Sequence, residues 1–170
     1  MLFRSPVDDH HRWLKDVEGH GGAKVQYPII ADHDLNVAKK YDMLEEDAGE
    51  TSQGRTAATN QTVRTVYMIG PDKLIKAMLI YPMSSGRNFD EVLRLLDSIQ
   101  LTAKHKVATP VNWKNGEDCI IVPSVSDEDA RTQFPGGWTS DLPYLRRVSQ
   151  PGREEKASEQ EQVPPEPQPV

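Results

Sequence analysis

Two arginines, Arg64 and Arg87, are the residues whose type and placement best suit chemistry on a group that develops negative charge. One opens a strand-like run, and the other stands directly before a helix start. Arginine stays charged and offers several N–H donors in a fixed, planar fork. Donors of this kind stabilise negative charge that appears as a bond breaks. A lone arginine at the start of a strand is more often a surface charge, so the surrounding pattern has to decide between the two interpretations.

The segment between the arginines predicts a β-hairpin followed by a helix. Its strand-like runs are RTVYMIG and LIKAMLIYP, which the turn Gly70–Lys73 joins. Pro71 pre-sets the backbone angle of the first turn position, and Asp72 is a residue that such turns favour. The helix begins at Asn88, whose spacing to Glu91 is that of a capping box. Both arginines therefore flank one strand–turn–strand–helix unit.

The preceding sequence predicts a helix, a short buried strand, a second helix and a polar surface loop, over residues 5–17, 25–31, 32–41 and 45–62. Apolar residues at helical spacing define the first helix, which Gly19–Gly22 should end. The second helix is expected to begin at Asp32 or Asp34. Gly, Ser, Thr and Asn dominate the loop.

Beyond the hairpin, the helix that begins after Asn88 carries an apolar stripe that should pack on the sheet, made of Phe89, Val92, Leu93, Leu96 and Ile99. After Lys106 the pattern changes to short irregular pieces, which indicate a small appended subdomain. From Gly152 onward almost no residue is apolar, and this composition predicts a disordered tail.

Composition narrows the function classes. The 170 residues suffice for one ordinary domain with an extension. A net charge of −6 without a basic run weighs against a nucleic-acid partner. The sequence has neither an apolar run of membrane-spanning length nor a signal peptide at its start, so we expect a cytoplasmic protein. No histidine or acidic group shows metal-ligand spacing, and we expect neither metal nor cofactor.

The motifs taken together resemble one protein family, the one-cysteine peroxiredoxins. The segment from Arg64 to Glu91, with YPIIADHDLNVAKKYDML before it and LTAKHKVATPVNWKNGEDCIIVPS after it, carries the resemblance over residues 5–151. The resemblance implies an α/β fold with an incomplete thioredoxin-like core over residues 5–104. It further implies a C-terminal subdomain over residues 105–151, before the disordered acidic, Pro-rich tail over residues 152–170.

The resemblance also implies an activity and its site. Family members are thiol-specific peroxidases that reduce hydrogen peroxide and alkyl hydroperoxides, consume a thiol reductant and form homodimers. A family arginine at the start of the strand leading into Gly-Pro-Asp lowers the pKa of the catalytic thiol and stabilises charge, and this position is Arg64 here. Arg87, in the GRNFDE segment, matches a second family arginine that supports the same pocket. Arg64 and Arg87 are therefore the catalytic residues that the resemblance implies.

The cysteine that these arginines would serve is missing from its expected motif. The family's catalytic cysteine stands in the pattern Pro-x3-Thr-x2-Cys, which this sequence lacks. The single cysteine, Cys119, opens the apolar run CIIV, where we expect a small packed side chain rather than a reactive thiol. The sequence therefore resembles a family member without its N-terminal half, and we expect no peroxidase activity from it alone.

Two other interpretations remain open. One is a non-catalytic module that forms dimers or associates with a full-length paralogue, through the LIKAMLIYP strand and the C-terminal subdomain that the family uses for dimers. The other is a fragment without independent function. Removing a strand–helix–strand from a sheet leaves an uncovered edge and exposed apolar faces.

Overall fold

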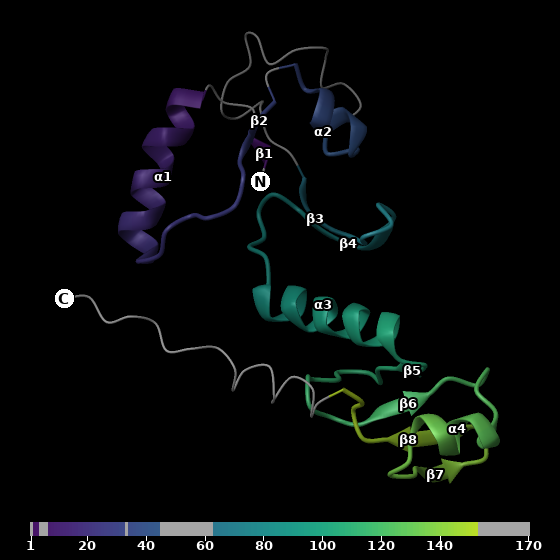
Figure 1. Cartoon of the computed structure of the whole chain (residues 1–170). Coiled ribbons are helices and arrows are strands. Elements are labelled where there is room, and N and C mark those ends of the chain that lie inside the picture. Colours follow the sequence, from purple (N-terminus) through teal and green to yellow (C-terminus); the bar gives the residue numbers. More distant parts are fainter. Residues whose placement is uncertain (1, 4–6, 33, 45–62, 153–170) are drawn as a thin grey trace. The chain divides into compact units, whose positions relative to one another are not determined.

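The computed structural model describes residues 2–3, 7–32, 34–44 and 63–152, which form a mixed α/β arrangement (Figure 1). The chain divides into two compact units, Met1–Arg87 and Asn88–Val170. The predicted loop over residues 45–62 and the predicted tail from residue 153 lie outside the described residues. The predicted boundary between residues 104 and 105 falls inside the second unit and stays a prediction.

The first helix is longer than predicted. Helix α1 spans Val7–Gly21 and continues through Gly19 and Gly21, two of the three glycines in the segment that was expected to end it. It ends where Gly22 adopts a left-handed backbone, with a φ of 69°, and donates its N–H to the Glu18 carbonyl at 3.0 Å. An isolated glycine costs a helix only about 1 kcal/mol, so the left-handed residue rather than the glycine content sets the end.

The segment that follows is less regular than predicted. Strand β2 is only Ile30–Ala31, paired in parallel with β1 at Leu2–Phe3, so the prediction of a strand over residues 25–31 was too long. Pro28 lies within that segment and has no N–H to give a sheet. Helix α2 spans Asn36–Lys40 and begins later than predicted.

Asp32 explains where α2 begins. Its carboxylate accepts the backbone N–H groups of Val37 at 3.0 Å and Ala38 at 2.8 Å. These N–H groups lie in the first turn of the helix and have no partner within it. Asp32 therefore caps the helix from outside, as its residue type suggested, with Leu35 in a left-handed conformation between them.

The predicted hairpin is confirmed. Strands β3, Arg64–Ile69, and β4, Ile75–Tyr81, are antiparallel, with Arg64 opposite Tyr81 and an irregularity at Ile69. The turn closes as expected, with the Lys73 N–H donating to the Gly70 carbonyl at 2.9 Å.

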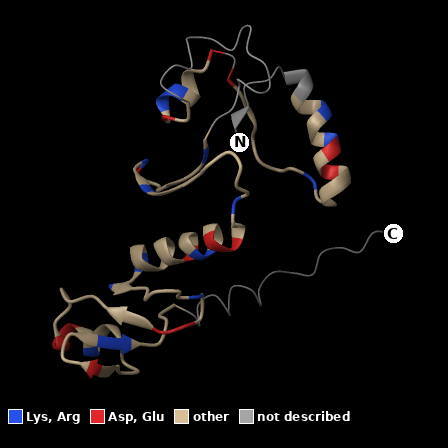
Figure 2. Ribbon diagram, turned by 180° about the vertical axis from the view of Figure 1, so that it is seen from behind, with Lys and Arg blue, Asp and Glu red and all other residues tan. Residues whose placement is uncertain are grey.

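The second unit begins with helix α3, Phe89–Lys104. The side chain of Asn88 accepts the Glu91 N–H at 3.2 Å, so half of the predicted capping box forms. The other half does not, because the Glu91 carboxylate binds Arg94 instead. Acidic residues occupy the first turn of α3 and a basic residue its last turn, which suits the helix dipole (Figure 2). Packing of the predicted apolar stripe against the sheet stays a prediction.

A four-stranded antiparallel sheet completes this unit, with strand order β5-β6-β8-β7 and helix α4 beside it (Figure 1). Its elements are β5 Val107–Ala108, β6 Cys119–Ile121, α4 Asp127–Gln133, β7 Thr139–Leu142 and β8 Leu145–Val148. Trp113 is fully buried in the core of this unit, and the partly buried Trp138 packs against that core. Among the described residues, no helix is long and apolar enough to cross a membrane.

Candidate functional site

Arg64 is held in place by the hairpin. It is the first residue of β3 and lies at the end of the hairpin away from the turn, opposite Tyr81. Side chains alternate between the faces of a strand, so Arg64 shares a face with Val66 and Met68. Met68 is buried and Arg64 half-buried. The hairpin therefore carries a cation at the edge of a largely apolar face.

Among the described residues, neither candidate arginine has a polar partner. Across the part of the chain that the structure describes, the guanidinium groups of Arg64 and Arg87 form no hydrogen bond or ion pair. Arg87 lies directly before the capping residue Asn88 and is half-buried. The structure shows no polar contact between the two arginines, and their assignment to one pocket stays a prediction.

The charged pair at the opposite end of the hairpin behaves differently. Asp72 accepts the Leu74 N–H at 3.2 Å and binds the Lys76 ammonium at 2.6 Å. The hydrogen bond from Lys76 lowers the pKa of the Asp72 carboxyl. Asp72 is exposed, and these contacts give it the turn-forming role that its sequence position predicted.

Cys119 has the environment of a structural thiol. Its side chain is fully buried in the core of the second unit, as the apolar run predicted. Burial, helped by the charge of Asp118 and opposed by a hydrogen bond with Trp113, raises the pKa of the thiol to about 11. At neutral pH roughly one thiol in ten thousand is then ionised. Peroxide attack needs the thiolate, and Cys119 supplies almost none.

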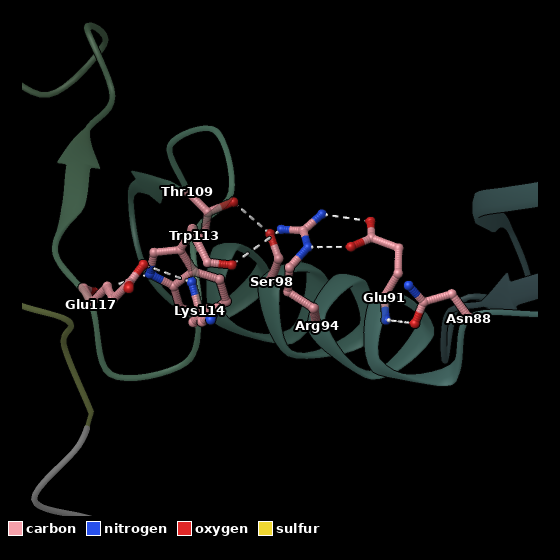
Figure 3. Close-up of polar contacts among 8 residues, drawn as sticks. All are labelled: Asn88, Glu91, Arg94, Ser98, Thr109, Trp113, Lys114 and Glu117. Atoms are coloured by element: carbon pink, nitrogen blue, oxygen red, sulfur yellow. Dashed lines mark hydrogen bonds and ion pairs between the residues drawn. The ribbon is translucent and has the colours of Figure 1, made fainter.

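A polar network in the second unit joins α3 to the loop before β6 (Figure 3). The Arg94 guanidinium binds both carboxylate oxygens of Glu91, at 2.6 and 2.8 Å, and reaches the Trp113 carbonyl at 3.5 Å. This pairing lowers the pKa of Glu91 and raises that of Arg94. The Trp113 indole N–H donates to the Glu117 carbonyl at 3.0 Å.

A second contact of this network is a hydroxyl pair. Ser98 on α3 and Thr109 after β5 lie 2.7 Å apart (Figure 3). The sequence pattern does not predict this network. The spacing of Glu91 and Arg94 was its only local signal, because the other partners are far apart along the chain.

Comparison with known proteins gives a consistent result. Residues 98–137 match the family model for the C-terminal domain of 1-Cys peroxiredoxin. The chain is 48% identical over 147 residues to a 1-Cys peroxiredoxin of Dictyostelium discoideum, covering 86% of this chain and 57% of that protein. It is 45% identical over 154 residues to peroxiredoxin-6 of Gallus gallus, covering 85% and 66%. The chain thus spans about three fifths of the length of these relatives.

Solved structures agree with the sequence relatives. A mutant of peroxiredoxin 6 from Arenicola marina superposes with a TM-score of 0.75 at 41% identity, covering 89% of this chain and 69% of that one. A yeast mitochondrial 1-Cys peroxiredoxin superposes with a TM-score of 0.77 at 39% identity, covering 87% and 68%. The predicted fold class and the predicted resemblance are confirmed.

Proposed function

Because the chain belongs to the 1-Cys peroxiredoxin family, we propose that it carries the charge-stabilising part of a thiol peroxidase site and does not reduce peroxide by itself. The substrates are hydrogen peroxide and alkyl hydroperoxides, and a thiol reductant completes the cycle. The family's Pro-x3-Thr-x2-Cys motif is absent from this sequence, and Cys119 does not take its place.

The observation that carries the proposal is the Arg64 guanidinium, which lies on a well-formed hairpin and has no polar partner among the described residues. A half-buried arginine that merely stabilised the fold would be expected to bind a carboxylate or a carbonyl group, as Arg94 does in the second unit. Within the described residues, Arg64 has no such partner. Its donors remain available to an anionic group such as a thiolate or a polarised peroxide.

The chemistry assigned to Arg64 is electrostatic. A cysteine thiolate attacks one oxygen of the peroxide, the O–O bond breaks, and the cysteine becomes a sulfenic acid. The other oxygen leaves with the electron pair of that bond and takes up a proton, as water or an alcohol. A fixed cation beside the thiolate lowers the thiol pKa and stabilises the charge on the leaving oxygen. Two equivalents of the thiol reductant return the sulfenic acid to the thiol.

A peroxide-consumption assay tests whether the chain is inactive by itself. We expect the 170-residue protein and its Cys119→Ser variant to consume hydrogen peroxide at the same background rate, because the buried thiol is almost entirely protonated. The background rate is that of hydrogen peroxide with the thiol reductant and no protein. Clear consumption that disappears in Cys119→Ser would make Cys119 the nucleophile and overturn the assignment.

One observation favours the non-catalytic alternative, a module that associates with another chain. Apolar side chains on β4 are exposed, with Met78 exposed by 52% and Ile80 by 64%. Exposed aliphatic strands are typical of protein interfaces. If this alternative holds, light scattering coupled to size exclusion will show a dimer, and Ile80→Lys will give a monomer. A monomeric parent chain would count against it.

A further inference from the structure

The turn between β5 and β6 contains the dipeptide Asn115–Gly116. Gly116 adopts a backbone with a φ of 106°, a region that side chains rarely allow, and Asn115 is exposed. An asparagine followed by glycine is the pair most prone to spontaneous deamidation, because glycine has no side chain to shield its backbone nitrogen. The other described asparagines precede larger residues, as Asn112 does before Trp113.

Hydrogen bonds hold both groups that would react. The Asn115 side-chain amide donates to an Asp97 carboxylate oxygen at 3.0 Å, and its carbonyl oxygen accepts from the Gln150 amide at 2.9 Å. The backbone N–H of Gly116 donates to the carbonyl oxygen of the same Gln150 side chain. A single glutamine, 35 positions from Asn115, therefore binds both the electrophile and the nucleophile.

We propose that Asn115 is a deamidation site and that Gln150 restrains its reaction. In this reaction the Gly116 nitrogen loses its proton and attacks the side-chain carbonyl carbon of Asn115. A C–N bond forms, ammonia leaves, and a cyclic imide results. Water then opens the imide to aspartate or isoaspartate, so the net change is the loss of ammonia and the gain of water.

Gln150 opposes this reaction in two ways. Its carbonyl oxygen keeps the proton on the Gly116 nitrogen, and an amide is too weak a base to remove it. Its N–H group, together with Asp97, pins the two ends of the Asn115 amide, so the side chain cannot rotate over the Gly116 nitrogen. Ring closure therefore requires the hydrogen bonds of Gln150 to Asn115 and Gly116 to break first.

Deamidation would also alter the contact with α3. The product has a carboxylate where Asn115 had an amide donor, and this carboxylate faces Asp97 at hydrogen-bond distance. Two like charges at this separation repel each other. The turn would therefore lose an attachment to α3 and gain a repulsion.

The test follows modification at Asn115 in the full chain during incubation at mildly alkaline pH, by peptide mapping with mass spectrometry. Gln150→Ala should raise the rate at Asn115 roughly tenfold, the factor that the loss of about two ordinary hydrogen bonds implies. The exposed Gln100→Ala is the matched control, and Asn112 in the same loop is the internal one. Equal rates in the parent and in a folded Gln150→Ala variant would overturn the restraint. A rate at Asn115 in Gln150→Ala no higher than at Asn112 would overturn the site.

A second measurement does not depend on how well Gln150→Ala folds. N115D mimics the product and should lower the thermal midpoint of the chain. D97N combined with N115D should restore it, because an amide again faces a carboxylate. An unchanged thermal midpoint in N115D, or no rescue by D97N, would show that deamidation does not destabilise the chain through repulsion from Asp97.

Discussion

Replacing Arg64 by alanine is expected to lower kcat/KM for hydrogen peroxide by about a hundredfold, once the chain is supplied with a catalytic cysteine. The assay uses a chimera in which the segment of the Dictyostelium discoideum relative that carries the family's cysteine motif precedes this sequence. The loss follows from the role proposed for Arg64, because a fixed donor to the developing charge acts in the transition state. The thiol pKa should rise in the same variant, since a neighbouring cation no longer favours the thiolate.

Matched variants separate this effect from a loss of structure. Lys76→Ala removes a cation from the same hairpin, at the end where Lys76 binds Asp72, and should leave kcat/KM nearly unchanged. Arg64→Lys keeps the charge but loses the planar fork, so an intermediate rate is expected. Arg87→Ala should lower kcat/KM less than Arg64→Ala does. Arg64 is proposed to stabilise the developing charge directly, whereas Arg87 is proposed only to support the same pocket. Equal losses in Arg64→Ala and Lys76→Ala would contradict the proposed role.

The sequence was most informative where structure depends on neighbouring residues. Turn chemistry and strand patterning between Arg64 and Tyr81 predicted the hairpin, which the structure contains. Local rules also identified Asn88 as a helix cap. They did not predict that the second half of the capping box is absent. The Glu91 carboxylate could bind either the Asn88 backbone N–H or the Arg94 guanidinium, and it binds the charged group.

Contacts between distant segments could not be predicted from the sequence. Gln150 meets Asn115 across 35 positions, and Ser98 meets Thr109 across two elements. Such pairs depend on how the C-terminal strands fold back beside the loop before β6, which no local pattern encodes. Burial of Cys119 was predictable because it begins an apolar run, whereas the rise of its thiol pKa to about 11 required the structure.

Arg146 illustrates the same limit and gives the second large prediction. It lies on β8 and is only 9% exposed, an unusual place for an arginine. Its guanidinium donates to the carbonyl oxygens of Val122 at 3.2 Å and Val125 at 2.6 Å, and binds the Asp127 carboxylate at 2.7 Å. It therefore ties the β6–α4 connection to the sheet.

Arg146→Ala should destabilise the protein by about 3 kcal/mol, because the buried Val125 carbonyl loses its donor at a cost of roughly 1–3 kcal/mol. The Asp127 carboxylate also loses its cation, and the Val122 carbonyl keeps only the Val125 N–H. Arg147→Ala is the matched control on the neighbouring residue. Arg147 binds Asp141 at 3.1 Å with both side chains about half exposed, so its loss should cost less than about 1 kcal/mol. Urea unfolding followed by tryptophan fluorescence measures both, since Trp113 and Trp138 report on this unit. Equal midpoints for the two variants would show that the buried donor contributes no more than a surface ion pair, and the β6–α4 connection would then owe its position to the apolar packing of Val125 and Ala130.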